Sequence, residues 1–311
     1  MSKNGFKYSE GLIKGLNELG SVKLNEYMKD YTSFKTGGAA DIIVFPKDNE
    51  SIPGIMRLSR DENIPLIVMG GGTNLLAGDK GIRGIVLRVS EGNNINGNIK
   101  VHNEDIVYAD ASVKKENFID FLLQEGFGGM EFMAGIPGCL GGGIMMNAGT
   151  DTGTFIDILE SIDVIDSSGT SKNLKIDKEM SSYRKFNLEE NSIVCGCYFR
   201  LNRAGNIDDI KKNIGDILKE REEKHPLSYP SAGSVFKNPP GHSSWQLIAD
   251  AGLKGKRIGG AMVSEKHTNF IINYDKASSM DVLNLIKLIQ EEVSSKFNVV
   301  LDTEIRMIGE F

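Results

Sequence analysis

The chain has 311 residues, of which 40% are hydrophobic and 25% are charged, and its formal net charge is -6. This composition is typical of an ordinary soluble globular protein with two or three domains. The negative charge gives no support for nucleic-acid binding, and no run of 18 apolar residues is present to suggest a membrane span. Glycine is unusually frequent: 36 of the 311 residues, or about 12%, are glycine, against a usual share of about 7%.

Alternating helix and strand signals predict a small α/β unit in the first part of the chain. The predicted helices cover 8–20 and 50–61, and the predicted strands cover 41–45, 66–69 and 84–89. The run Leu66-Ile67-Val68-Met69 is continuously apolar and leads into three glycines. It therefore predicts a buried strand that feeds a glycine turn.

From about residue 90 the pattern changes to an α+β one. We expect strands over 105–113, 161–166 and 193–201 and a helix over 115–125, then helices over 206–224, 243–251 and 279–296. The 206–224 helix is predicted to turn Ile207, Ile210, Ile214, Ile217 and Leu218 inward. A last strand over 299–308 alternates between its two faces.

The three cysteines, Cys139, Cys195 and Cys197, form neither a disulfide framework nor a zinc pattern. Because Cys195 and Cys197 lie two residues apart in a predicted strand, we expect both thiols to face one side and to be buried. Free thiols indicate a reducing compartment, and the first residues precede no apolar segment of a secretory signal. The four histidines show no metal-ligand spacing.

Two glycine-rich stretches are candidates for ligand-binding loops. The first is 70–76, Gly-Gly-Gly-Thr-Asn-Leu-Leu, and the second runs from Ala134 to Gly143 and on to Asn147-Ala148-Gly149. Consecutive glycines expose N–H groups that can wrap a diphosphate, and two such loops suit a dinucleotide. Tight turns that pack two sheets together are the structural alternative. Six glycines between 135 and 149 argue against helix in this stretch, at about 1 kcal/mol each.

The stretch 229–239 places one hydroxyl, Ser234, directly after Gly233 and just ahead of Lys237 and Asn238. The small neighbours leave room for a ligand, and the lysine and amide side chains suit an anionic, polar one. We predict a functional loop that runs into a short buried strand. Arg184 lies between aromatic residues and could hold a carboxylate, although an ordinary surface arginine is the favoured explanation when this segment is taken alone.

Read together, these segments resemble the UDP-N-acetylenolpyruvoylglucosamine reductase (UDP-N-acetylmuramate dehydrogenase) family, in the shorter form that lacks a tyrosine-bearing loop. The resemblance covers about residues 30–309. The matching segments follow in family order: 32–41, 70–81, 134–149, Tyr183-Arg184, 229–239, 251–267 and 301–306.

The resemblance implies an α+β protein with a two-subdomain FAD-binding fold of the vanillyl-alcohol-oxidase type and a C-terminal α+β substrate domain. The ranges expected are 1–89 and 90–204 for the FAD-binding subdomains, 205–300 for the substrate domain and 301–311 for a strand returning to the active site. It also implies non-covalent FAD, NADPH as electron donor, a UDP-sugar substrate, no metal, and a cytoplasmic monomer that binds neither nucleic acid nor membrane.

The resemblance implies NADPH-dependent reduction of an enolpyruvyl sugar nucleotide through FAD, in peptidoglycan precursor synthesis. Ser234 maps to the family's proton donor, and Arg184 and Glu304 map to the residues that orient the carboxylate and stabilise the enolate. The implied substrate-binding residues are Tyr183, Lys224, Lys237 and Asn238. The implied cofactor-binding residues are Gly70, Gly71, Gly72, Thr73, Asn74, Leu75, Ala134, Gly135, Ile136, Pro137, Gly138, Gly141, Gly142, Asn147 and Ala148.

Departures from the family pattern affect the flavin contacts rather than the class. They include Met145-Met146 and Asn269, which stands where we expect glycine. Two other functions stay open from the sequence alone. A sugar or hydroxy-acid oxidase on the same scaffold would often link its flavin covalently, for which Cys139 is the one candidate in the flavin loops. A non-catalytic UDP-sugar sensor is the other, against which the presence of Ser234, Arg184 and Glu304 speaks.

Overall fold

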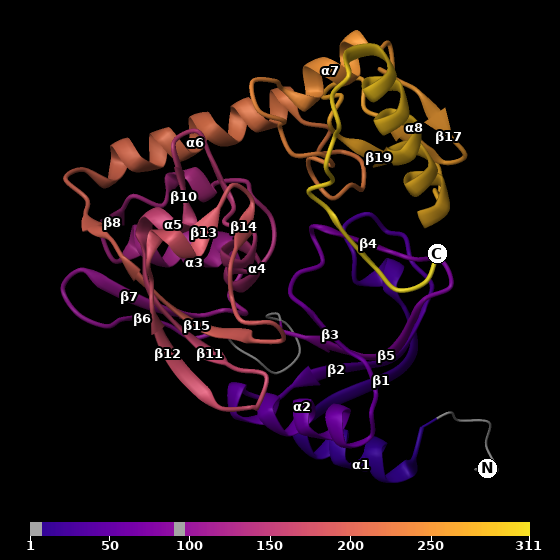
Figure 1. The fold of residues 1–311 in the computed structure, drawn as a ribbon. Coiled ribbons are helices and arrows are strands. Elements are labelled where there is room, and N and C mark those ends of the chain that lie inside the picture. The colour runs from indigo at the N-terminus through magenta and orange to yellow at the C-terminus, as the bar shows by residue number, and fades with distance from the viewer. Residues whose placement is uncertain (1–7, 90–96) are drawn as a thin grey trace. The chain divides into compact units, whose positions relative to one another are not determined.

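The computed structural model describes residues 8–89 and 97–311 (Figure 1). The chain forms two compact units. Unit 1 comprises Met1–Leu24, Ile42–Gly71 and Gly84–Ile217, and unit 2 comprises Asn25–Asp41, Gly72–Arg83 and Leu218–Phe311. The four predicted domain ranges stay a prediction. The expected boundary at 89/90 borders on residues 90–96, and the expectation about a secretory signal concerns residues 1–7; both stretches lie outside the described residues.

The first sheet has the strand order β1-β2-β5-β3, built from β1 (Gly20–Tyr27), β2 (Ala39–Pro46), β5 (Ile82–Arg88) and β3 (Leu66–Met69). Helices α1 (Glu10–Leu19) and α2 (Ile52–Asp61) bury Leu12, Leu16, Ile52 and Ile55 in the same apolar core as strand residues of this sheet. Ser9 caps α1 by accepting a hydrogen bond from Leu12 N at 3.1 Å. The predicted helices and strands of this part are confirmed.

Strand β3 was predicted to be buried, and this is wrong for Val68, which is 41% exposed. The strand has the predicted bounds but pairs only with β5, in parallel, and so lies at the edge of the sheet. An edge strand has one side without a neighbouring strand, so an apolar run does not guarantee burial.

The second sheet of unit 1 is antiparallel, with the order β12-β11-β15-β7-β6. Its strands are β12 (Ser171–Lys175), β11 (Leu159–Ile165), β15 (Ile193–Arg200), β7 (Ile106–Asp110) and β6 (Ile99–Val101). Helices α3 (Lys115–Gln124), α4 (Leu140–Met145) and α5 (Phe155–Ile158) contribute Phe118, Leu140 and Phe155 to one core with it.

Helix α4 corrects the expectation that glycines keep this stretch out of a helix, because it contains Gly141, Gly142 and Gly143. A Cβ atom on Gly143 would lie 2.6 Å from the Phe155 ring, and one on Gly141 would lie 2.9 Å from Ala111 Cβ. Close packing against these neighbours therefore outweighs the poor helix propensity of glycine.

The expectation that Cys195 and Cys197 face one side is also wrong. Cys195 joins the core of the first sheet and Cys197 that of the second. The register of β15 against β11 shifts between Val194 and Gly196, so Cys195 is an extra, bulged residue. A β-bulge reverses the alternation of side chains that spacing alone predicts. Both thiols are buried as expected, and burial raises the pKa of Cys195 to about 12.

Unit 2 holds a three-stranded sheet of β17 (Arg257–Ile258), β18 (Ala261–Val263) and β19 (Ile271–Asn273), packed with α7 (Ser244–Asp250) and α8 (Ser279–Phe297). Helix α8 buries the stripe that its sequence predicts: Val282, Leu285, Ile286, Ile289 and Val293. Strand β4 (Leu75–Ala77) pairs in parallel with β20 (Arg306–Ile308).

Two predictions for the C-terminal part need correction. Helix α6 (Ile207–Lys224) forms as expected, but Leu218 is 45% exposed, while Ile210 and Ile214 pack partly against the core of the second sheet. The predicted strand over 299–308 is reduced to an isolated bridge from Thr303 to Phe236 and to the three residues of β20. Alternating side chains do not make a ladder where a partner strand is missing.

The remaining elements are short. They are the strand pairs β8 (Phe127–Gly128) with β16 (Asn202–Arg203), β9 (Gly149–Thr150) with β10 (Gly153–Thr154), and β13 (Ser181–Ser182) with β14 (Lys185–Phe186), and the 3-10 turns at Met28–Asp30, Asn49–Ser51, Glu131–Met133 and Lys178–Met180. None of the helices that the structure describes is long and apolar enough to span a bilayer.

Candidate active site

Parts of both predicted glycine loops lie against each other in unit 1. A Cβ on Gly71 would lie 3.1 Å from Gly138 Cα, and one on Gly70 would lie 4.0 Å from Cys139 Cβ. Gly135 and Gly138 have φ angles of 70° and 98°, which side chains other than glycine rarely adopt. Glycine is thus favoured at 135 and 138 by backbone conformation and at 71 by close approach.

The second loop is hydrogen-bonded to the segment between β7 and α3. Leu140 N donates to Val113 O and Gly141 N to Ala111 O, both at 2.9 Å. Beside these contacts the Ser112 hydroxyl is buried and has no hydrogen-bond partner. Gly142 is exposed, and a Cβ there would meet no atom within 4 Å. An open glycine surface beside an unsatisfied donor fits a loop that receives a ligand.

Asn147 and Ala148 close the loop from its other end. The Asn147 side chain is 7% exposed, and its Oδ1 accepts a hydrogen bond from Ile156 N at 3.1 Å. Ala148 O accepts one from Phe155 N at 3.1 Å. These contacts hold α5 to the loop and occupy Oδ1 of Asn147. A cofactor-binding role of Asn147 would therefore use its side-chain Nδ2 or its backbone.

The rest of the first loop, Gly72 to Leu75, belongs to unit 2. Gly72 O accepts from Ser33 N at 3.1 Å, and Asn74 O accepts from Arg306 N at 3.0 Å. The Asn74 side chain donates to Glu304 O at 3.1 Å. The buried hydroxyls of Ser33 and Thr36 have no hydrogen-bond partner. Asn74 and Glu304, which sequence reasoning assigned to different tasks, are therefore neighbours.

Ser234 lies in an extended segment that is pinned on two sides. It forms an isolated bridge with Phe270, and Val235 N donates to Asn269 O at 2.8 Å. On the other side, Glu304 N donates to Val235 O at 2.7 Å. The structure thus places the backbone segments that carry Ser234 and Glu304 side by side within unit 2. Val235 and Phe236 are buried, as predicted for a loop that runs into an apolar extended segment.

Asn269 has a structural role that the sequence did not reveal. Its side chain is 5% exposed and is hydrogen-bonded to the backbone of Phe236. Asn269 Oδ1 accepts from Phe236 N at 2.9 Å and Nδ2 donates to Phe236 O at 2.8 Å. A single asparagine directly ahead of the apolar run Phe270–Ile272 was the available signal, since a buried amide must be hydrogen-bonded.

Arg184 lies in unit 1, at the turn between β13 and β14, with φ of 57°. Its Nη2 donates to Gly149 O at 3.1 Å, which ties the guanidinium to the end of the second glycine loop. The guanidinium carbon is 5.1 Å from the centre of the Tyr183 ring, and Tyr183 is 52% exposed. Arginine and tyrosine therefore form a small positively charged corner next to the loop.

The other predicted substrate residues lie in unit 2 and have structural partners. Lys224, the last residue of α6, pairs with Glu220 at 2.5 Å, and both side chains are exposed. Lys237 O accepts from Ser244 Oγ, and Asn238 Oδ1 accepts from Ser244 N at 3.0 Å, next to the start of α7. Asn238 thus serves the entry to a helix as well as any ligand.

Two of the histidines, which show no metal-ligand spacing in the sequence, pack behind the Ser234 segment. The rings of His225 and His267 are 5.4 Å apart, and His225 stacks on Phe270 at 5.0 Å. Burial, with nearby Arg221, lowers the pKa of His225 to about 4, and burial lowers the pKa of His267 as well. Both rings are therefore neutral at pH 7. Within residues 8–89 and 97–311, no group of three potential ligands is placed to hold a metal ion.

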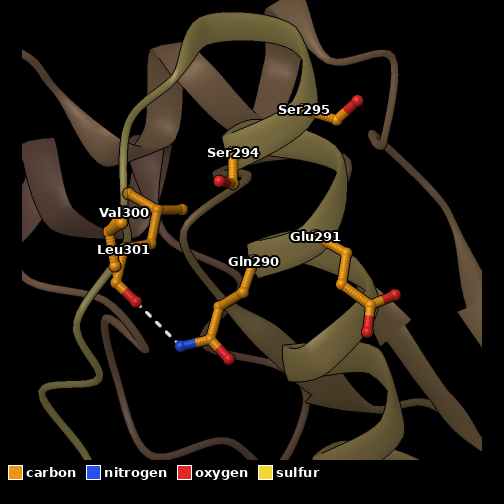
Figure 2. A pocket seen from close by; sticks show the side chains of 6 residues that line it. All are labelled: Gln290, Glu291, Ser294, Ser295, Val300 and Leu301. Atoms are coloured by element: carbon orange, nitrogen blue, oxygen red, sulfur yellow. Dashed lines mark hydrogen bonds between the residues drawn. The ribbon is translucent and has the colours of Figure 1, made fainter.

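A surface depression lies beside α8 in unit 2. Figure 2 shows its lining, which includes Gln290, Glu291 and Val300. The Gln290 side chain donates to Leu301 O at 2.8 Å and so holds the chain where it returns from the helix. None of the predicted catalytic or cofactor-binding residues lines this depression.

Comparison with known proteins identifies the class. A family model described as an FAD binding domain matches residues 40–175. The crystal structure of UDP-N-acetylenolpyruvylglucosamine reductase from Thermus caldophilus matches with a TM-score of 0.76 at 29% identity, covering 93% of this chain and 98% of that one. The chain is thus an FAD-dependent oxidoreductase, and the predicted fold class and FAD are confirmed.

A second family model, described as the UDP-N-acetylenolpyruvoylglucosamine reductase C-terminal domain, matches residues 225–308. Proteins named UDP-N-acetylenolpyruvoylglucosamine reductase from Caldanaerobacter subterraneus subsp. tengcongensis and Clostridium botulinum strain 657 are 42% and 43% identical. The matches cover 97% and 93% of this chain and 99% and 93% of the relatives. The chain belongs to the UDP-N-acetylenolpyruvoylglucosamine reductase family.

Proposed function

We propose that the protein reduces the enolpyruvyl group of UDP-N-acetylglucosamine enolpyruvate to give UDP-N-acetylmuramate, a step of peptidoglycan precursor synthesis, with NADPH as electron donor. Family membership over almost the whole chain supports this reaction. The observation that carries the residue assignment is the hydrogen bond from Glu304 N to Val235 O at 2.7 Å, which holds Glu304 beside the Ser234 segment.

FAD, once reduced, supplies the hydride that adds to the terminal carbon of the double bond. Negative charge then develops on the carbon next to the carboxylate, and that carbon must take up a proton. Ser234 donates this proton from Oγ. A serine hydroxyl is a poor acid in water, so the residues around it must stabilise the charge that passes between the hydroxyl and the substrate.

Arg184 and Glu304 supply that stabilisation in this proposal. The Arg184 guanidinium presents several N–H donors in a plane, a geometry that matches a carboxylate, and its bond to Gly149 O limits its rotation. Glu304 acts at the enolate and, as an acid, would donate a hydrogen bond to it. Tyr183, Lys224, Lys237 and Asn238 bind the remainder of the sugar nucleotide, where cationic and amide donors suit a diphosphate.

The cofactor assignment follows the two glycine loops. Residues 70–75 and 134–148 hold FAD without a covalent link, and in unit 1 the close approach of Gly71 to Gly138 and the open face of Gly142 support this. We further propose that residues 1–89 and 90–204 form the FAD-binding subdomains, with the substrate domain at 205–300 and the returning strand at 301–311. The enzyme would act in the cytoplasm as a monomer, where nucleotide-linked precursors and NADPH are available.

Separate half-reactions test the proposal. Holoprotein is reduced anaerobically with NADPH, and flavin reoxidation is then followed after the enolpyruvyl sugar nucleotide is added. Ser234→Ala should be reduced at a normal rate but reoxidised about 10²–10⁴-fold more slowly, the usual size of a proton-transfer contribution. Ser231→Ala, three residues earlier in the same segment, is the matched control and should behave as wild type. Normal reoxidation of Ser234→Ala would exclude the proton-donor role.

A further inference from the structure

Lys115 is a buried lysine directly beneath the second glycine loop, and no motif of the sequence points to it. It is the first residue of α3 and is 4% exposed. Its Nζ donates to Pro137 O at 2.8 Å, and its backbone N donates to Gly138 O at 3.1 Å. One residue therefore binds two consecutive carbonyl groups of the loop.

These two hydrogen bonds set the direction of two peptide groups. A trans peptide is planar, and its N–H points opposite to its C=O. Because the carbonyls of Pro137 and Gly138 point toward Lys115, the N–H groups of Gly138 and Cys139 point to the opposite side of the loop. The φ of 98° at Gly138 is part of this arrangement. Lys115 thus turns two donors away from α3.

The ammonium group of Lys115 is also a positive charge in a buried environment. A Cβ on Gly143 would lie 2.8 Å from Lys115 Cε, so the stem of the side chain packs tightly under α4. Burial lowers the pKa of Lys115 to about 8, against the opposing effects of nearby Cys139 and Glu116. In the part of the chain that the structure describes, no carboxylate forms an ion pair with Lys115. A buried cation without a counter-ion is costly unless a bound anion compensates it.

We propose that Lys115 is a positioning residue for FAD, which directs the N–H groups of Gly138 and Cys139 toward an anionic group of the cofactor and balances its charge. The inference rests on the proposed assignment of residues 134–148 to FAD binding. The anionic group is either the diphosphate or the reduced ring system, and both would be held by the same chemistry.

Titration of apoprotein with FAD, followed by flavin fluorescence, tests the inference. Lys115→Met, which keeps the length of the side chain but removes charge and donor, should weaken FAD binding about tenfold or more at pH 7. Lys114→Met is the matched control, because Lys114 is 51% exposed and pairs with Glu116 at 3.9 Å. It should stay within about twofold of wild type, since exposed charges contribute little. Wild-type affinity should fall as pH rises through about 8, whereas that of Lys115→Met should stay level.

Further arms separate the sources of the anion. ADP in place of FAD should lose affinity for Lys115→Met if the diphosphate is the partner. If the reduced ring is the partner, Lys115→Met should instead lower the midpoint potential of the bound flavin. The potential should fall by about 30 mV for each tenfold by which the affinity for the two-electron reduced form drops more than the affinity for the oxidised form. Unchanged affinity of Lys115→Met, or a level wild-type profile between pH 7 and 9.5, would overturn the inference, and the wild-type profile decides if the variant fails to fold.

A second variant, Gly142→Glu, tests the assignment of residues 134–148 to FAD binding separately from the role of Lys115. It places a carboxylate on the open face of the loop and should abolish FAD binding. If Gly142→Glu binds FAD normally, the loop is not the cofactor site and the assignment itself fails. If Gly142→Glu loses FAD while Lys115→Met does not, only the role of Lys115 is wrong.

Discussion

Gly142 and Gly143 are neighbours in α4, and alanine at each should change stability in opposite directions. In a helix interior alanine is favoured over glycine by about 1 kcal/mol. This gain is available at Gly142, where an added Cβ meets no atom within 4 Å and the φ angle is in the ordinary negative range. We expect Gly142→Ala to raise the free energy of unfolding of the apoprotein by about 1 kcal/mol.

At Gly143 the same gain is outweighed by overpacking. The added Cβ would lie 2.6 Å from Cζ of Phe155 and 2.8 Å from Cε of Lys115. The Phe155 ring is 1% exposed and packs edge-on against Phe132 and Phe199, with centroids 5.8 and 6.2 Å away, so it cannot move aside alone. Overpacking a core costs about 1–3 kcal/mol or more. Gly143→Ala should therefore lower the free energy of unfolding by about 1–2 kcal/mol.

Chemical denaturation of the two apoproteins, followed by circular dichroism at pH 7, measures the difference. The pair should differ by about 2–3 kcal/mol, with wild type between them. Because the substitutions are identical and adjacent, helix propensity cancels and the packing contribution is isolated. If Gly143→Ala is as stable as Gly142→Ala, steric packing is not the reason for glycine in α4, and the account of that helix is refuted.

Four further outcomes follow from the site and its supports. Glu304→Gln should slow flavin reoxidation by about 10²–10³-fold, the size typical of a lost stabilising group, without changing the denaturation midpoint; an unchanged rate would exclude its role. Ser279→Ala should cost about 1–2 kcal/mol in denaturation, because Ser279 is fully buried and its hydroxyl donates to Ala77 O at 2.5 Å. Lys115→Met should make the apoprotein more stable than wild type at pH 7, because the pKa of Lys115 is about 8 in the native state and lies below its unfolded value. The advantage is at most about 3 kcal/mol, and denaturation at several pH values should show it shrinking between pH 8 and 10.5. His225→Phe should reduce the loss of stability as pH falls from 6.5 to 4, the window between the unfolded pKa and the native value of about 4, and thermal melts that show the same acid sensitivity in both proteins would contradict it.

Local patterns in the sequence were sufficient where an element depends on its own residues. Helix α8 spans Ser279–Phe297 against a prediction of 279–296, and it buries the predicted stripe. Ser278 and Asp281 form a capping box at its start, so the beginning of the helix is encoded within four residues. Strand β3 likewise has the predicted bounds, because an apolar run between a proline and a glycine is a short-range signal.

Predictions failed where the outcome depends on a distant partner. The alternation over 299–308 is visible in the sequence, but residues there are strand only where Phe236 or β4 supplies a ladder. The bulge at Cys195 depends on the register against β11, and the helix through Gly141–Gly143 depends on Phe155 and Ala111. Spacing along the chain cannot reveal these contacts, since each joins segments far apart in sequence.

The sequence by itself determined the chemistry of the protein: the glycine loops, the hydroxyl of Ser234, and the residues that link the chain to its family. Only the tertiary structure decided how those groups are held. Asn269 is hydrogen-bonded to Phe236, 33 residues away, and Glu304 is hydrogen-bonded to Val235 and to Asn74, which is 230 residues away. Residue type sets what a side chain can donate or accept, but burial and direction arise only when the folded chain excludes water and brings remote backbone groups within hydrogen-bonding distance.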